Sequence, residues 1–388
     1  MEEIQIPFSI VIRRKWKYLI FILLFTEILI LLTNKIDYLN PIYSNADFNK
    51  YIKMAEASPQ LTNEIIRPFV YRIIVPWIVG QLPLSTINGF YLINNFALFF
   101  LAVSVFIFLL DFNVEIKIAF ILTITFQLNR YFFLYNTWNY FQTCDVISLG
   151  ILFISFILLK RKNWLMLFLI FPLSVLVKEY VLMFIPAGFI YLFIKKESLK
   201  NFFIYSILSI TSIAIYFLIR KLIISEGGES LYTQYTTQVI YFSKPDLLIK
   251  RFIVPFTPFG LIPIIFIKET IKFFKKYIYL IIYTLTVIVL SFFGEPERLM
   301  SPLSIVILLY LSEIFTNIFD LSLKINYYRI FLITFFTIVF IASFYHIWGI
   351  IKLPTKELSM IFTFAVNVLM VILFLVFKNF SKFKIKFL

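Results

Sequence analysis

Residues 34–88 read NKIDYLNPIYSNADFNKYIKMAEASPQLTNEIIRPFVYRIIVPWIVGQLPLSTIN. This stretch is the first long polar interruption between two apolar runs, 16–33 and 89–110, each about long enough to cross a bilayer. It holds one acid in a suggestive position, Asp47. We therefore predict a membrane protein whose first outer loop gathers polar side chains.

The composition agrees with this interpretation. The chain has 388 residues, of which 61% are hydrophobic, and its mean hydropathy is +0.92, whereas soluble domains are about 45–50% apolar. The net charge of +15 would suggest nucleic acid for a soluble protein. Here the basic residues concentrate in alternate loops, so we assign them to topology and lipid headgroups and exclude nucleic acid. The single cysteine, Cys144, excludes an internal disulfide.

The apolar runs predict an all-α polytopic fold with about 10–12 transmembrane or half-spanning helices, in one domain covering residues 1–388. The run 164–194 is broken by Lys178 and Glu179, and each half covers only about 21–23 Å, so we predict a short hairpin. The other predicted spans are 16–33, 89–110, 118–135, 144–159, 201–222, 252–267, 277–293, 302–319, 330–350 and 358–377.

Basic residues set the predicted orientation, because cytoplasmic loops are enriched in lysine and arginine. They place both termini in the cytoplasm, and they place the loop 34–88, the hairpin tip and the loop 223–251 outside. Four basic residues fall outside and count against this scheme: Arg220, Lys221, Lys250 and Arg251.

Asp47 allows two interpretations. Ser44 and Asp47 fit the S-x-x-D pattern of a helix N-terminus, so the loop is predicted to contain a short amphipathic helix on the outer membrane surface. In the structural interpretation, Asp47 only supports that N-terminus. In the functional one, it is a general base that accepts the proton of an acceptor hydroxyl.

Arg67 and Arg72 frame the segment RPFVYR. Pro68 suits the first position of a helix, and Pro76 is expected to kink or end it. The arginines are five residues apart, so one can face a site while the other faces headgroups. They are either interfacial anchors or a phosphate clamp.

Lys178 and Glu179 are costly inside an apolar segment, at about 2.5–3.5 kcal/mol for a charge at the centre of a helix. Adjacent residues on a helix do not face each other. Each therefore needs its own partner or a wet cavity, with Glu27 as a candidate partner for Lys178. The pair either positions the hairpin or takes part in function.

The stretch FGEPERLMSP, residues 293–302, forms a third cluster. Pro296 and Pro302 suit first turns of helices, and Arg298 would add charge where a helix N-terminus favours a phosphate. Glu297 orients Arg298 or is a solvated acid. Asp145 begins a span, where we assign it a structural role.

No phosphate-binding loop or dinucleotide fingerprint is present, which argues against a nucleotide-dependent enzyme. Outward carboxylates could hold a divalent cation through oxygen, but we assign no metal ligand.

Together these features resemble the GT-C glycosyltransferases, polytopic enzymes that take sugars from polyprenyl-phosphate carriers. The resemblance rests on Asp47 before the stretch Pro68–Arg72, on Lys178 and Glu179 in the hairpin, and on Glu297, Arg298 and Pro302. It is greatest to the bacterial and mannosyltransferase-like branches. The resemblance implies that Asp47 is the general base, and that Arg298 with Lys178 or Arg72 holds the carrier phosphate. The family's frequent paired acids are missing here, since the position two before Asp47 is Asn45 and Phe48 follows it.

The expected function is transfer of a sugar from a polyprenyl-phosphate donor to a glycan, lipid or protein acceptor at the outer face of a bacterial or archaeal cell membrane. Direct displacement would invert the anomeric centre. One alternative is a lipid-linked oligosaccharide polymerase or ligase. Another is a transporter or flippase, which would tend to show repeated halves, and the sequence contains no repeat.

Overall fold

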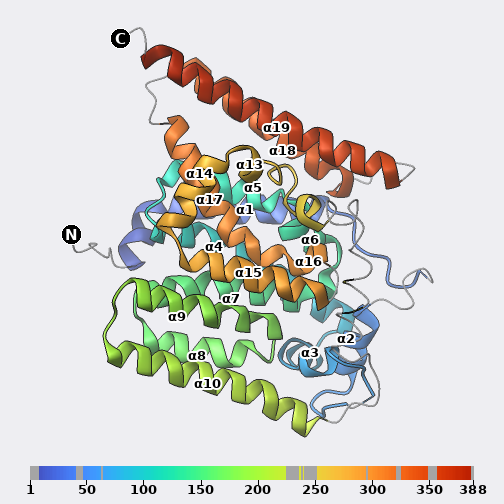
Figure 1. Cartoon of the computed structure of the whole chain (residues 1–388). Coiled ribbons are helices and arrows are strands. Elements are labelled where there is room, and N and C mark those ends of the chain that lie inside the picture. Colours follow the sequence, from blue (N-terminus) through green and yellow to red (C-terminus); the bar gives the residue numbers. More distant parts are fainter. Residues whose placement is uncertain are drawn as a thin grey trace. The chain divides into compact units, whose positions relative to one another are not determined.

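The computed structural model describes residues 8–40, 47–62, 64–223, 236, 239, 251–293, 296–319, 325–347 and 356–385. Within these ranges every regular element is a helix, as the sequence predicts (Figure 1). The chain packs as two compact units. Unit 1 comprises residues 1–31, 35–111 and 139–228, and unit 2 comprises residues 32–34, 112–138 and 229–388.

Unit 1 is built around two long apolar helices, α4 and α7, which pack against each other. Their contact is aromatic, with the rings of Phe108 and Phe153 5.1 Å apart. Helix α8 packs against both α7 and α10, as Figure 1 shows in green. The helices of unit 1 are α1 (Phe8–Leu32), α2 (Asp47–Glu56), η2 (Phe69–Tyr71), α3 (Ile74–Gly80), α4 (Thr86–Asp111), η4 (Tyr140–Gln142), α7 (Thr143–Lys160), α8 (Trp164–Ser174), η5 (Glu179–Met183), α9 (Phe184–Ile194) and α10 (Leu199–Leu222).

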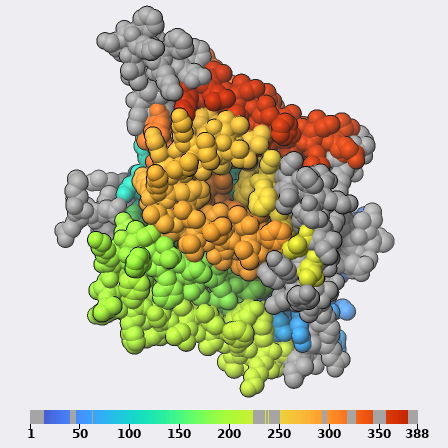
Figure 2. All heavy atoms as spheres, in the orientation of Figure 1, coloured from blue at the N-terminus to red at the C-terminus, as the bar shows by residue number. Residues whose placement is uncertain are grey.

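The outward face of α10 is apolar. Phe203, Ile210 and Phe217 are each more than 60% exposed, and their helix forms the yellow-green surface in Figure 2. An exposed apolar face of this length suits lipid rather than water.

The first loop carries two short helices that pack tightly together. Helix α2 buries Phe48, Tyr51 and Met54 on one face, which is the spacing of an amphipathic helix. Gly80, at the end of α3, allows the close approach, because a Cβ there would lie 2.1 Å from the carbonyl oxygen of Ala55. The two helices thereby fix where Asp47 and Tyr51 lie within unit 1.

Unit 2 contains more broken helices. The axis turns by 64° between α5 and the segment Arg130–Trp138, and by 109° between α14 and α15. Its helices are α5 (Ile116–Gln127), η3 (Arg130–Leu134), α6 (Tyr135–Trp138), η6 (Val254–Phe256), α13 (Ile262–Ile265), α14 (Ile267–Lys276), α15 (Tyr279–Leu290), η7 (Ser291–Phe293), α16 (Pro296–Leu299), η8 (Ser301–Leu303), α17 (Ser304–Phe319), α18 (Ile325–Ile347) and α19 (Lys356–Ile385).

Not every predicted span is one continuous helix. The span 118–135 bends after α5. Residues 252–267 form the end of a helix at 252–253 and the short helices η6 and α13, with turns around them. Pro255, Pro258 and Pro263 explain the difference, because proline removes a backbone donor and clashes with the preceding turn of a helix. The hydropathy of this run does not reveal that its prolines interrupt the helix.

Four described helices are long and apolar enough to cross a membrane, or up to six if each bent pair counts as one span. The chain therefore has the character of an integral membrane protein. Two arginines that count against the predicted topology are held by aromatic rings within their own units. Arg220 lies between Tyr71 and Tyr216, and Arg251 is fully buried against Phe292.

Candidate functional site

Arg72 forms a forked ion pair with Glu179 in unit 1. Its Nη2 lies 2.8 Å from Oε1 of Glu179, and its Nε lies 3.3 Å from Oε2. The remaining nitrogen, Nη1, donates to the Tyr51 hydroxyl at 2.9 Å. Such charge-assisted forks fix geometry as well as charge. The Arg72 side chain is buried, whereas the Glu179 side chain is 26% exposed.

Lys178 has a different partner. Its Nζ lies 2.5 Å from Oδ1 of Asp145, and both side chains are buried. The Tyr180 hydroxyl donates to the main-chain oxygen of Asp145 at 2.8 Å, and the Tyr180 ring lies 4.7 Å from the Lys178 ammonium. We call Tyr51, Arg72, Asp145, Lys178 and Glu179 the Arg72 cluster.

The local backbone explains how adjacent residues reach opposite partners. Lys178 is extended, with φ −162° and ψ 132°, and it stands between the end of α8 and the start of η5 at Glu179. The chain is therefore not helical at the pair, and the two side chains leave it in separate directions. The partner of Lys178 is Asp145 rather than Glu27, so that candidate pairing was wrong.

Asp145 is the residue of this cluster whose ion pair the sequence interpretation missed. It lies in the first turn of α7, as predicted, but it also neutralises a buried lysine. Charge balance could have suggested this, because a lysine inside an apolar hairpin requires an acid at a similar depth. The four charged members of the cluster sum to zero.

Asp47 is the first residue of α2 and lies beside this cluster through a series of contacts. Its Oδ1 is 3.1 Å from Nζ of Lys50, and its side chain is 25% exposed. The Lys50 ammonium lies 4.0 Å from the Phe69 ring, which also lies 5.0 Å from the Arg72 guanidinium. Phe69 thus contacts both the lysine that pairs with Asp47 and the arginine of the cluster.

The environment of Tyr51 keeps its hydroxyl neutral. Burial raises the pKa of Tyr51 well above its usual value, against the opposing effect of the Arg72 charge. A neutral phenol accepts from Arg72 and retains its own proton, so Tyr51 holds the guanidinium without neutralising it.

The remaining predicted site residues lie elsewhere. Arg67 is exposed, in contrast to buried Arg72. Arg298 belongs to unit 2, where its guanidinium lies 5.8 Å from the ring of Tyr135. Glu297 is in the four-residue helix α16, and its side chain is outside the described part of the structure. Most of the loop 223–251 is also outside it.

Both buried cations of the Arg72 cluster already face carboxylates, so neither presents a full positive charge to an incoming phosphate. Within the described residues, no three His, Cys, Asp or Glu side chains are grouped to hold a metal ion. Comparison with protein-family models, curated proteins and solved structures finds no match to the chain.

Proposed function

We propose that the chain is a membrane glycosyltransferase of the GT-C type, which transfers a sugar from a polyprenyl-phosphate donor to an acceptor hydroxyl. One observation carries the proposal. A partly exposed carboxylate, Asp47, adjoins a buried network of charges drawn from three separate segments of an otherwise apolar helical unit. Burying a charge inside an apolar membrane unit costs free energy, and charged residues at such positions usually serve a function.

In the proposed reaction, Asp47 accepts the proton of the acceptor hydroxyl while that oxygen attacks the anomeric carbon. The bond from this carbon to the phosphate oxygen breaks, and the polyprenyl phosphate leaves with the electron pair. Attack opposite the leaving group inverts the anomeric centre. No step in this scheme requires a metal ion.

The carrier phosphate needs a cation that it can reach. Arg67 is exposed, and the partly exposed carboxylate of Glu179 marks the accessible side of Arg72. We assign Arg67 to direct contact with the phosphate, which it would stabilise as it gains charge. We assign Arg72 a shared contact, in which its guanidinium serves both Glu179 and the phosphate. The Lys178–Asp145 pair is more deeply buried, and we assign it the role of positioning Glu179 and hence Arg72.

The finer topology is part of the proposal. About 10–12 spanning or half-spanning segments, with both termini in the cytoplasm, would put the Arg72 cluster at the outer face of a bacterial or archaeal cell membrane. The ion pairs support this alternation. Lys378 pairs with Glu269 in unit 2, and Lys162 pairs with Glu197 in unit 1, all four at ends predicted to be inside.

The experiment is donor consumption by membranes that contain the wild-type chain, supplied with a panel of polyprenyl-phosphate sugars and an envelope extract as acceptor source. Asp47→Asn should lower turnover by about 10²–10⁴-fold, the usual contribution of a general base. The matched control is Asp37→Asn, which changes an exposed acid of the same loop and should leave turnover unchanged.

Equal turnover by the wild type and Asp47→Asn would contradict the role of Asp47. No turnover of any donor would contradict the transferase itself, and it would favour the polymerase, the ligase or the transporter.

A further inference from the structure

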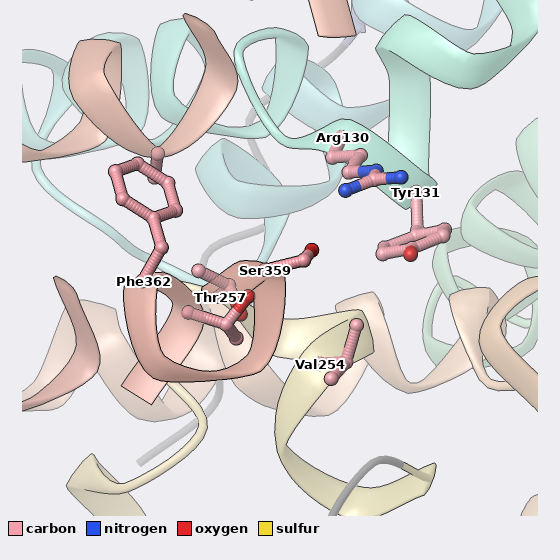
Figure 3. A pocket seen from close by; sticks show the side chains of 8 residues that line it. Arg130, Tyr131, Val254, Thr257, Ser359 and Phe362 are labelled. Carbon is pink, nitrogen blue, oxygen red and sulfur yellow. The ribbon is translucent and has the colours of Figure 1, made fainter. Parts of the chain in front are cut away.

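Unit 2 contains a second polar site, far from the Arg72 cluster in the sequence. It is a small pocket with an arginine, four hydroxyl groups and three apolar side chains in its wall (Figure 3). We call it the Arg130 pocket. Its lining residues are Arg130, Tyr131, Val254, Thr257, Ala342, Ser359, Phe362 and Thr363.

Hydrogen bonds connect the segments that form the wall of the pocket. Asn129 caps the start of η3. Its side chain accepts from the main-chain nitrogens of Tyr131 and Phe132 and donates to the main-chain oxygen of Thr257 at 3.0 Å. From the other side, Nδ2 of Asn367 donates to the Thr257 hydroxyl at 3.2 Å. These contacts join η3, η6 and α19 around the pocket, so the site is built into the fold.

Arg130 opens a π-helical turn, η3, at the point where the axis bends. Turns of this type are rare and often occur at functional sites. An arginine within a predicted span is costly unless it faces an anion or a polar cavity. In Figure 3 the guanidinium extends into the pocket, and the Ser359 hydroxyl turns toward it from α19.

The hydroxyls of Ser359 and Thr363 on α19 differ in their hydrogen bonding from most other serine and threonine hydroxyls of the described helices. In apolar helices a serine or threonine usually returns a hydrogen bond to the carbonyl one turn earlier, as Thr123, Thr284 and Thr337 do here. Among the described residues, the Ser359 and Thr363 hydroxyls have no hydrogen-bond partner. They are four residues apart on the same helix and therefore share a face. Both are available as donors to a ligand.

The size of the pocket limits its ligand. The space that the centre of a water molecule can occupy in this partly open pocket is about 10 Å³, roughly the room that one water-sized group needs. The eight lining residues carry one positive charge and include no acid. A single anionic oxygen fits these features, provided the rest of its group lies outside the opening. Arginine and hydroxyls together are typical donors to phosphate.

We propose that the Arg130 pocket binds one phosphate group, with one phosphate oxygen seated between Arg130 and the hydroxyls of Ser359 and Thr363. The predicted topology puts these residues near outer helix ends, at the depth of lipid headgroups. The phosphate can therefore belong to a lipid headgroup or be free in solution. The proposal rests on unit 2 alone and does not require the glycosyltransferase activity.

The test is ligand binding to the purified full-length chain in detergent, measured by native mass spectrometry and by titration. The probes are a short-chain phosphatidic acid and inorganic phosphate. Arg130→Gln should weaken binding by about ten- to a hundredfold, because a charge-assisted contact is lost. Ser359→Ala combined with Thr363→Val should weaken it by about three- to tenfold. The matched control, Arg329→Gln, changes an exposed arginine of α18 and should bind as the wild type does.

Binding of phosphatidic acid without competition from inorganic phosphate would identify a lipid headgroup as the source. Equal competition by inorganic phosphate would identify a site for free phosphate. Binding unchanged in both pocket variants, or no saturable binding of either probe by the wild type, would overturn the proposal. If Arg130→Gln does not fold, the double hydroxyl variant decides the question, since it changes little volume.

Discussion

Unit 1 holds two charged clusters, at the ends of its helices that the sequence predicts to be outside and inside. The Arg72 cluster joins residues up to 107 positions apart, and its four charged side chains are mostly buried. The other, which we call the Asp111 cluster, ties the ends of neighbouring helices together. In it Arg161 lies 2.5 Å from Asp111, and Lys162 lies 2.9 Å from Glu197. The members of the Asp111 cluster are Asp111, Lys160, Arg161, Lys162 and Glu197.

The difference lies in what each arrangement costs. In the Asp111 cluster the carboxylate of Asp111 is 5% exposed, but its cations keep contact with water: Lys160, Arg161 and Lys162 are 15%, 21% and 48% exposed. Ion pairs whose cation is solvated contribute little to stability. Lys178 and Asp145 are 3% and 9% exposed, so their desolvation is expensive and only their pairing offsets it. Residues that only fix neighbouring helix ends together do not need a fully buried ion pair. We therefore interpret the Asp111 cluster as structural and the Arg72 cluster as a site.

The largest effect on stability is expected for Lys178→Met. This change leaves the Asp145 carboxylate buried without its ammonium partner, which should lower the free energy of unfolding by about 3–5 kcal/mol. Unfolding of the purified chain in mixed micelles measures it. Combining Lys178→Met with Asp145→Leu should recover most of the loss, and a double variant as unstable as the single one would refute the ion-pair explanation.

Arg72→Lys should have the next largest effect. Lysine keeps the charge but cannot make the fork to Glu179 together with the bond to Tyr51, so we expect a loss of about 1.5–3 kcal/mol. The same unfolding measurement applies. Wild-type stability in this variant would mean that the fork contributes nothing and that the two clusters do not differ in this respect.

Tyr51→Phe removes only the acceptor for Nη1 of Arg72. The expected cost is about 1 kcal/mol, because a buried donor loses one hydrogen bond while its ion pair remains. A thermal-unfolding series that contains Tyr51→Phe, Arg72→Lys and the double variant tests this. The effects should not add, since both changes break the same contact.

The smallest effect is expected for Arg161→Lys in the Asp111 cluster. Asp111 keeps Lys160 nearby at 3.8 Å, and the Arg161 side chain is 21% exposed. The cost should be about 1 kcal/mol or less. A loss as large as that of Arg72→Lys, in the same unfolding assay, would remove the contrast between the clusters.

The sequence predicted the helical class well, because long apolar runs have few structural solutions in lipid. It failed at 252–267, where composition is apolar but three prolines prevent one continuous helix. It also counted Arg220 and Arg251 as evidence against the topology. In the fold Arg220 lies over Tyr71 and Arg251 over Phe292, two rings that are distant in the sequence, and no local pattern predicts these contacts. The contact of Arg220 with Tyr216, four residues earlier, is local.

For the candidate site, the sequence could identify the costly residues but not their partners. Lys178 and Glu179 stand out in any hydropathy profile. Their pairing with Asp145 and Arg72 depends on how three segments pack, and this is long-range information. The sequence pattern assigned no role to Arg130. The hydroxyls that face it come from α19, more than 200 residues later in the chain.

The central claim is that the Arg72 cluster serves catalysis and the Asp111 cluster serves structure. The most direct measurement is turnover of the accepted polyprenyl-phosphate sugar by Arg72→Lys and Arg161→Lys, each divided by the amount of folded protein. We predict a loss of about a hundredfold or more for Arg72→Lys, because a displaced phosphate contact misaligns the reacting atoms, and wild-type turnover for Arg161→Lys. Equal turnover in the two variants would contradict the account.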